Sequence, residues 1–294
     1  MSSATEIDLR QIRHFLAVAR DRNFTRAATG LGITQSALSR SIRGLEQSIG
    51  AALFERRPRE VTLTETGQIL LRETADLDIR ASAAVARARD AGRPARLRVL
   101  ARGCDSALAG RIVDGYHATA PAVPAQLSFS DPLTHPDALR AGAAEAAFLR
   151  FPYDQAGLDA EVLFTDPRVA LVAQSHPLAA RGRVDLADLA DDPVTVPPVS
   201  TEAERAYWAA ADLRPRRWRP GPDARDSLDI LAVVRHGLAI SFVPASMLTG
   251  VALDGLRSLT VDGLSPSLVT IAWAEDATAP ALAAFVRHAC SASI

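Results

Sequence analysis

The stretch ITQSALSRSIRGLEQSIG, residues 33–50, decides how the N-terminal part of this chain folds. At about 100° per residue, its apolar side chains form one narrow stripe along a helix. Thr34 stands at the N-cap position and Gly50 at the position of a C-terminal glycine, so we expect a helix between them. The apolar stripe consists of Leu38, Ile42, Leu45 and Ile49.

The opposite face of this predicted helix carries no acidic residue. It presents hydroxyl, amide and guanidinium groups, on Ser36, Ser39, Arg40, Arg43 and Gln47. Such groups hydrogen-bond to base edges and phosphates, whereas an ordinary solvated helix face mixes both signs of charge. An amphipathic helix in a plain bundle would explain the apolar stripe equally well, but it would leave the acid-free face unexplained.

Two shorter helices are predicted before this one. Asp8 and Gln11 fit the N-cap and capping-box positions of the first, and the second runs from Thr25 to Leu31. A tight turn at residues 32–34 then leads into the third helix. Three short helices with such a turn form a helix-turn-helix, in which the third helix enters the major groove of DNA.

A basic turn follows the three helices. Arg56, Arg57 and Arg59 stand just before a predicted strand at residues 60–63, which suits a wing whose arginines enter the minor groove or contact phosphates. The first 63 residues hold ten arginines and six acidic residues, whereas residues 96–294 hold 18 arginines and 23 acidic residues. A basic front and an acidic back are expected if only the front meets a polyanion.

Residues 7–67 resemble the winged helix-turn-helix of LysR-type transcriptional regulators. The segments LRQIRHFLAVARDRNFTRAA and LGITQSALSRSIRGLEQSIGAALFERRPREVTLTETG carry this resemblance. Asn23 departs from it, since the family usually has serine there, but asparagine caps a helix about as well. The resemblance implies contacts with double-stranded promoter or operator DNA. The expected DNA-binding residues are Thr34, Gln35, Ser36, Ser39, Arg40 and Arg43 on the third helix, and Arg56, Arg57 and Arg59 on the wing. For Arg43 a solvated surface position is an equal alternative.

Residues 65–89 are predicted to form one long helix, since they contain no proline and no glycine after Gly67. At ~1.5 Å per residue this helix would run ~35 Å. The resemblance implies antiparallel pairing of this helix in a dimer, and the alternative is packing against its own effector domain. Its seam follows a seven-residue pattern of mostly small residues, Leu70, Thr74, Leu77, Ala81, Ala84 and Ala88.

From residue 97 onward, predicted strands and helices alternate, which indicates an α/β fold with mixed sheets. The resemblance implies a periplasmic-binding-protein-like effector domain of two subdomains. We assign the winged helix-turn-helix to residues 1–64, the linker helix to 65–91 and the effector domain to 95–294. Subdomain I comprises residues 95–161 and 267–294, and subdomain II comprises 162–266, so the chain would cross out near residue 161 and return near residue 267.

Ligands of open α/β sheets bind beyond the carboxyl ends of the strands. A carboxylate effector held by Ser106, Arg150 and helix N–H groups is the first hypothesis. Asp105 and Asp131 would repel an anion unless a guanidinium pairs with them, so a cationic or neutral effector stays open as the alternative. The predicted effector-binding residues are Gly103, Cys104, Ser106, Ser130 and Arg150, with Thr195, Ser200, Thr201 and Ser227 facing them.

The sequence therefore predicts a LysR-type transcriptional regulator that senses a small molecule. We expect no enzyme activity, cofactor or metal, because no nucleophile elbow, phosphate loop or zinc-hydrolase motif is present and His176 has no second histidine at ligand spacing. The alternative is a solute-binding or enzymatic α/β protein that carries a non-functional DNA-binding head.

Location and partners follow from the same features. No stretch of ~20 residues is apolar enough to span a bilayer, and the N-terminus lacks the basic and apolar regions of a signal peptide, so we expect a cytoplasmic protein. Cys104 and Cys290 are then expected to be free thiols. The expected partners are DNA, the effector, further copies in a dimer or tetramer, and RNA polymerase, with no membrane contact.

Overall fold

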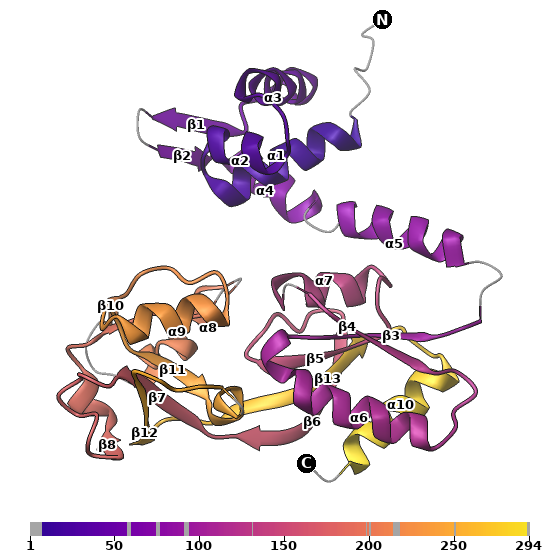
Figure 1. Ribbon diagram of the computed structural model, residues 1–294. Coiled ribbons are helices and arrows are strands. Elements are labelled where there is room, and N and C mark those ends of the chain that lie inside the picture. The colour runs from indigo at the N-terminus through magenta and orange to yellow at the C-terminus, as the bar shows by residue number, and fades with distance from the viewer. Residues whose placement is uncertain are drawn as a thin grey trace, which may run out of the picture. The chain divides into compact units, whose positions relative to one another are not determined.

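A computed structural model describes residues 8–57, 60–74, 77–90, 94–130, 132–197, 199, 201–213, 218–249 and 251–292. The chain divides into two compact units, Met1–Arg89 and Asp90–Ile294. The first unit is helical with one small hairpin, and the second contains two larger sheets (Figure 1). Among the described helices, none has the length and apolar character that a membrane crossing requires.

Three helices open the first unit, α1 (Leu9–Asp21), α2 (Phe24–Gly30) and α3 (Gln35–Ile49). Their ends are fixed by the residues that the sequence suggests. Asp8 and Gln11 form a capping box, and the Thr34 side chain accepts a hydrogen bond from the backbone N–H of Ala37. Gly50 closes α3 with φ of 80°, a left-handed conformation that favours glycine. Asn23 caps α2, as serine would.

The apolar stripe of α3 forms the centre of this unit's core. Leu38, Ile42 and Leu45 are fully buried, whereas Ile49 is half-buried at the edge. Phe54 packs against Phe15 of α1, with ring centroids 5.4 Å apart. Burial of this stripe leaves the opposite face of α3 directed away from the core.

A hairpin follows α3. Strands β1 (Phe54–Arg57) and β2 (Glu60–Leu63) pair antiparallel, with Phe54 opposite Leu63 and Arg57 opposite Glu60. The sequence predicted β2 but not β1. Pro58 and Arg59, which stand between the two strands in the sequence, lie outside the described residues.

The predicted linker helix is present as two described segments, α4 (Glu65–Thr74) and α5 (Leu77–Asp90). Residues 75 and 76, between them, lie outside the described part of the chain. Leu70 and Leu77 pack against the core of the first unit, whereas Ala84 and Ala88 are exposed. The seam is thus covered near its start and open toward its end.

The first sheet of the second unit has the strand order β4-β3-β5-β13-β6. Helices α6 and α10 cover one face of it and α7 covers the other. Its strands are β3 (Leu97–Ala101), β4 (Ala125–Phe129), β5 (Ala146–Phe151), β6 (Leu158–Asp166) and β13 (Ser267–Ala274), and its helices are α6 (Ser106–Ala118), α7 (His135–Arg140) and α10 (Pro280–Ser291). The 3-10 turns η1 (Gly103–Asp105) and η2 (Pro132–Thr134) precede α6 and α7.

The second sheet has the order β11-β7-β12-β8. Helix α9 packs on one face, and α8 packs on the other together with the turn η3. The elements are β7 (Arg168–Ala173), β8 (Arg183–Asp185), η3 (Leu186–Leu189), α8 (Glu202–Trp208), η4 (Ala211–Leu213), α9 (Ser227–Arg235), β11 (Ser241–Pro244), η5 (Ala245–Leu248) and β12 (Leu256–Asp262). A separate parallel pair consists of β9 (Pro193–Val194) and β10 (Arg219–Pro220).

The two sheets are joined by two adjacent chain crossings. β6 stays paired with β13 as far as Asp166, which lies opposite Ser267. The chain therefore leaves the first sheet after Asp166, and the predicted crossing near residue 161 is too early, because Val162 and Phe164 belong to one continuous strand. The return crossing ends at Ser267, where β13 begins. Both crossings thus meet at one polar pair of residues.

Candidate nucleic-acid interface and effector site

The polar face of α3 is open to solvent at most of the predicted DNA-binding positions. Thr34, Gln35, Ser36, Arg40 and Arg43 are exposed. Ser39 differs, since it is only 5 % exposed and its hydroxyl accepts a hydrogen bond from Nε2 of Gln35 at 3.0 Å. Ser39 therefore orients the Gln35 amide at the edge of the exposed face.

The acidic residue of α3 is directed away from this face. Oε1 of Glu46 accepts a hydrogen bond from the backbone N–H of Leu53 at 2.9 Å, which ties the end of α3 to the chain that enters the hairpin. The exposed part of the helix that follows Thr34 consequently carries hydroxyl, amide and guanidinium groups. A guanidinium matches phosphate oxygens or guanine edges, and an amide matches adenine.

A residue that the sequence did not single out fixes the orientation of α3. Nδ1 of His14 on α1 lies 2.7 Å from Oγ of Ser41. Burial lowers the pKa of His14, and the nearby Arg10 guanidinium lowers it further. His14 and Ser41 are 27 residues apart, and no local pattern marks such a pair.

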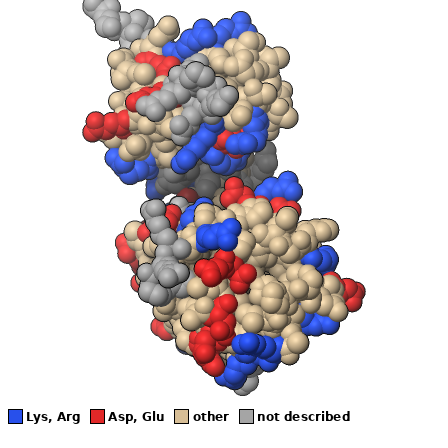
Figure 2. Space-filling view, turned by 90° about the vertical axis from the view of Figure 1, so that its left-hand side faces the viewer, with Lys and Arg blue, Asp and Glu red and all other residues tan. Residues whose placement is uncertain are grey.

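The wing is described only by its backbone. Arg56 and Arg57 lie in β1, and Arg59 lies outside the described residues, so the role of the three arginines stays a prediction. Figure 2 shows arginine side chains at several places on the visible face of the first unit, and a band of acidic side chains across that of the second.

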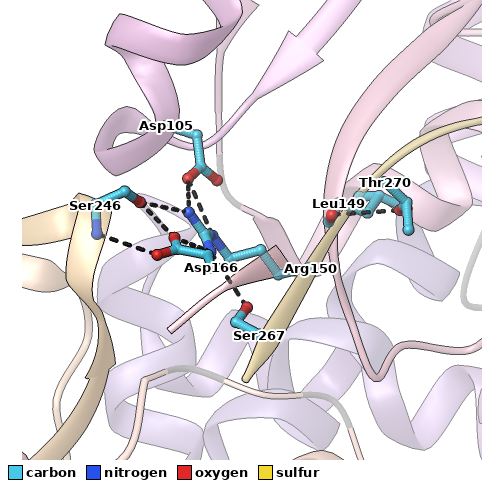
Figure 3. Close-up of polar contacts among 7 residues, drawn as sticks. All are labelled: Asp105, Leu149, Arg150, Asp166, Ser246, Ser267 and Thr270. Atoms are coloured by element: carbon cyan, nitrogen blue, oxygen red, sulfur yellow. Dashed lines mark hydrogen bonds and ion pairs between the residues drawn. The ribbon is translucent and has the colours of Figure 1, made fainter. Parts of the chain in front are cut away.

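The second unit contains a buried ion-pair network centred on Arg150 (Figure 3). Arg150, at 1 % exposed, contacts two carboxylates and two hydroxyls. Its Nε and Nη2 atoms donate to Oδ1 of Asp105 at 3.0 and 2.6 Å, and its Nη1 atom donates to Oδ2 of Asp166 at 2.8 Å. Nη1 also donates to Ser267 Oγ and Nη2 to Ser246 Oγ, at 3.2 and 3.0 Å.

This network joins both subdomains at their crossings. Asp105 and Arg150 belong to the first sheet and its loops, whereas Ser246 lies in η5 beside the second sheet. Asp166 and Ser267 are the residues of the two crossings, and Asp166 also accepts hydrogen bonds from the N–H and hydroxyl of Ser246. Burial by itself lowers the pKa of Arg150, but the two carboxylates outweigh it and hold the pKa above its ordinary value.

The network changes the interpretation of Arg150. A guanidinium has five N–H donors, and the five hydrogen bonds above use all of them. The carboxylate hypothesis requires an open guanidinium, and Arg150 does not present one in this structure. The negative charge of Asp105, which by itself would repel an anionic effector, is paired with the Arg150 guanidinium. The carboxylate hypothesis required such a pairing.

The other predicted effector residues near the first sheet differ in exposure. Gly103 and Ser106 are exposed at the start of α6. Cys104 is partly buried and packs against the core beneath α9, and burial raises the pKa of its thiol. Ser130 Oγ lies 2.9 Å from Nε2 of His135. Asp131 lies outside the described residues.

The residues predicted on the second sheet's side mainly hold local structure. Thr195 is 1 % exposed and donates to the carbonyl oxygen of Pro222 at 2.7 Å. Thr201 caps α8, and Ser227 is the first residue of α9, after the N-cap Asp226. Ser200 lies outside the described residues. The backbone N–H of Ser106 donates to the carbonyl oxygen of Gly103, but among the described residues no side-chain hydrogen bond joins two members of the predicted effector set.

Sequence reasoning missed Asp166, Ser246 and Ser267, which bond to Arg150 from 16, 96 and 117 residues away. It also missed Arg168, which is 4 % exposed, bonds to the Ser265 carbonyl and lies over the Tyr207 ring at 3.9 Å. Only the fold brings such partners together. Within the described part of the chain no cluster of His, Cys, Asp and Glu is suited to a metal ion, and both cysteines are free.

Comparison with known proteins identifies both units. The family model described as "Bacterial regulatory helix-turn-helix protein, lysR family" matches residues 9–68, and "LysR substrate binding domain" matches residues 90–292. The chain is 34% identical to the HTH-type transcriptional regulator IlvR of Caulobacter vibrioides, over 96% of this chain and 97% of that protein. It is 30% identical to the regulator BudR of Raoultella terrigena, over 82% and 86% of the two chains.

Solved structures share the fold. Full-length BenM superposes with a TM-score of 0.54 at 25% identity, covering 96% of this chain and 95% of that one. Full-length CbnR, described as complexed with its target DNA, gives 0.55 at 23% identity over 96% and 98%. The matched family model and these relatives are described as transcriptional regulators. The chain therefore belongs to the LysR family of DNA-binding transcriptional regulators, with an N-terminal helix-turn-helix and a C-terminal effector-binding domain.

Proposed function

We propose that the exposed face of α3 contacts the bases and phosphates of an operator, and that the wing contacts the adjacent backbone. The observation that supports this most strongly is the exposed, acid-free surface of Gln35, Ser36 and Arg40 on a helix whose other face packs into the core of the first unit. Ser39 contributes by orienting Gln35. Thr34, Arg43 and the wing arginines supply further contacts.

We propose further that the protein acts as a homodimer or tetramer in the cytoplasm. The exposed small residues Ala84 and Ala88 of α5 suit close packing against a second α5, and a helix-turn-helix commonly occupies two half-sites as a dimer. RNA polymerase is the proposed partner at the promoter. No catalytic step belongs to this proposal.

The effector is proposed to bind where η1 and the start of α6 meet the second subdomain. This position lies beyond the carboxyl end of β3, the usual ligand side of an α/β sheet. Binding there would change the relative stability of two subdomain arrangements, provided that the effector has different affinities for them.

Binding to DNA from the chain's own upstream region tests the α3 assignment. Fluorescence anisotropy is measured over a range of salt concentrations for the wild type, Arg40→Ala and Arg111→Ala. Arg40→Ala is expected to weaken binding by roughly 10-fold or more and to reduce the salt slope by about 1, because one guanidinium contact is lost.

Arg111 is the matched control, since it is an exposed arginine on α6, in the other unit. Its substitution removes the same charge and should leave affinity nearly unchanged. Equal affinity of Arg40→Ala and the wild type would refute the assignment of α3. Absence of any sequence-specific DNA binding by the wild type would instead favour a non-functional head.

A further inference from the structure

Only one of the two carboxylate oxygens of Asp105 accepts hydrogen bonds among the described residues. Its Oδ1 atom accepts both hydrogen bonds from Arg150, whereas its Oδ2 atom is buried and has no donor among the described residues. Figure 3 shows this second oxygen apart from the dashed contacts of the network. Asp105 is 3 % exposed, and a buried carboxylate oxygen without a donor is unfavourable, so this atom is suited to a ligand that supplies a donor.

The same loop holds an unused donor. Nε of Arg102, three residues before Asp105, is also buried and has no acceptor in the described part of the chain. The first turn of α6 adds further donors, because its N-cap residue Asp105 makes no side-chain capping bond and the hydroxyl of Ser106 is exposed. The backbone N–H of Ser106 is already used, since it donates to the carbonyl oxygen of Gly103. A helix N-terminus favours a negatively charged group. The loop therefore offers one acceptor beside several donors.

We infer that the effector is a small zwitterion of the α-amino-acid type, whose ammonium group binds Asp105 Oδ2 and whose carboxylate binds Arg102 and the start of α6. This inference rests on the proposed effector site and specifies its ligand. The sequence left open whether the effector is a carboxylate or a cationic or neutral molecule, and a zwitterion carries both a carboxylate and an ammonium group. The sum of charges around Arg150 agrees, since two buried carboxylates face one buried guanidinium.

Arg150 then has a positioning role. Its two hydrogen bonds to Oδ1 fix the Asp105 carboxylate and leave the other oxygen for the ligand. The hydroxyl of Ser246 bonds to the same guanidinium from η5. Arg150 therefore connects the ligand-binding carboxylate to the second subdomain without touching the ligand.

Access to Asp105 requires movement of the subdomains. Residues of η1 contact those of η5, and Cys104 packs against the core that contains Met247. Oδ2 of Asp105 is covered in this arrangement. A ligand ammonium therefore reaches it only when the residues around η1 move. Because η5 of the second subdomain contacts η1, we expect such a movement to couple ligand binding to the subdomain arrangement.

Thermal unfolding of the full-length protein tests the ligand class. The probes are the twenty standard L-amino acids, each compared with the carboxylic acid that lacks its amino group and the amine that lacks its carboxyl group. We expect at least one amino acid to raise the Tm, with neither of its two partial analogues doing so at the same concentration. A panel in which no amino acid raises the Tm would contradict the inference.

Two substitutions assign the contacts. Asp105→Asn should weaken the responding amino acid by about 10- to 100-fold, because the amide cannot balance the ammonium charge. Arg102→Gln, which leaves the Arg150 network intact, should weaken binding of the same ligand by roughly 10-fold, and it keeps the test valid if Asp105→Asn fails to fold. Arg111→Gln, on an exposed position of α6, is the control and should bind as the wild type does.

Unchanged affinity in a folded Asp105→Asn variant, or in Arg102→Gln, would overturn the inference. So would equal binding of the analogue without an amino group. DNA binding is measured on the same preparations, so that a failure of the ligand class can be distinguished from a failure of the proposed regulatory function. A protein that binds its operator but no zwitterion contradicts only the ligand class, whereas zwitterion binding without any effect on DNA binding contradicts the sensing role.

Discussion

The hydrogen bond between His14 and Ser41 joins helix α1 to helix α3. Burial and the Arg10 charge lower the pKa of His14, so its neutral form is favoured in the folded state. The unfolded chain therefore binds the proton more readily. The stabilisation from neutral His14 is complete above the unfolded pKa of about 6.5 and is lost as pH falls through the lower folded pKa.

We therefore predict that the wild type loses more stability between pH 7 and pH 5 than His14→Gln does. Urea unfolding of both proteins at pH 5, 6, 7 and 8 measures this difference. Comparison of the two proteins cancels the contributions of the other histidines. Parallel pH profiles for the wild type and the variant would show that His14 is not the group responsible.

Single residues also show how far sequence reasoning extends. Asp8, Thr34 and Gly50 were identified from the sequence because a cap acts within four residues of its own position. The partners of Arg150 could not be, because Asp105 and Ser246 reach it from 45 and 96 residues away. The same holds for Arg98, whose Nη2 atom donates to Oε1 of Glu145 at 2.6 Å across 47 residues of sequence.

Among the structural elements, α4 closely approaches the chain that leads into the hairpin. A Cβ atom on Gly67 would lie 2.2 Å from the carbonyl oxygen of Leu53 and 2.9 Å from Leu63. The Thr64 hydroxyl also donates to the Ala52 carbonyl at 2.7 Å. Glycine at the start of α4 therefore permits the close approach that seats the hairpin on the helices.

Gly67→Ala should destabilise the first unit by roughly 1–3 kcal/mol, because the neighbouring atom is backbone and cannot move aside cheaply. Gly30→Ala is the matched control, since a Cβ there meets nothing within 4 Å. That variant should be neutral or up to about 1 kcal/mol more stable. Chemical denaturation of both variants provides the measurement, and equal stability of the two would disprove the close-packing argument.

The strands were predicted unevenly. The sequence predicts strands at residues 97–101 and 168–173, because each is a short apolar run bounded by turn residues, and β3 and β7 occupy these ranges. β12 was missed although it lies inside the second sheet between β7 and β8. Its exposed Arg257 and Ser258 interrupt the alternation that marks a strand. The sequence does not indicate the full length of β6, because most of its nine residues are exposed or half-buried and form no apolar run.

Over the whole molecule, the fold class of each part followed from the sequence, because the helix-turn-helix has a strong local pattern and the α/β part alternates regularly. The positions of the chain crossings could be found only from the strand pairing, because nothing in the sequence distinguishes Asp166 and Ser267 as the crossing residues. Neither the ion-pair network nor the unused Asp105 oxygen follows from residue spacing.

The measurement that bears most on DNA recognition is the selection of bound sequences from a random pool by the wild type and by Gln35→Ala. We predict that the wild type enriches two related half-sites about 10 base pairs, or a multiple of that, apart, as a dimer requires. Gln35→Ala should still bind DNA but lose base preference at one position in each half-site, because only the amide contact is removed. Identical base preferences for the two proteins would show that α3 does not recognise the sequence.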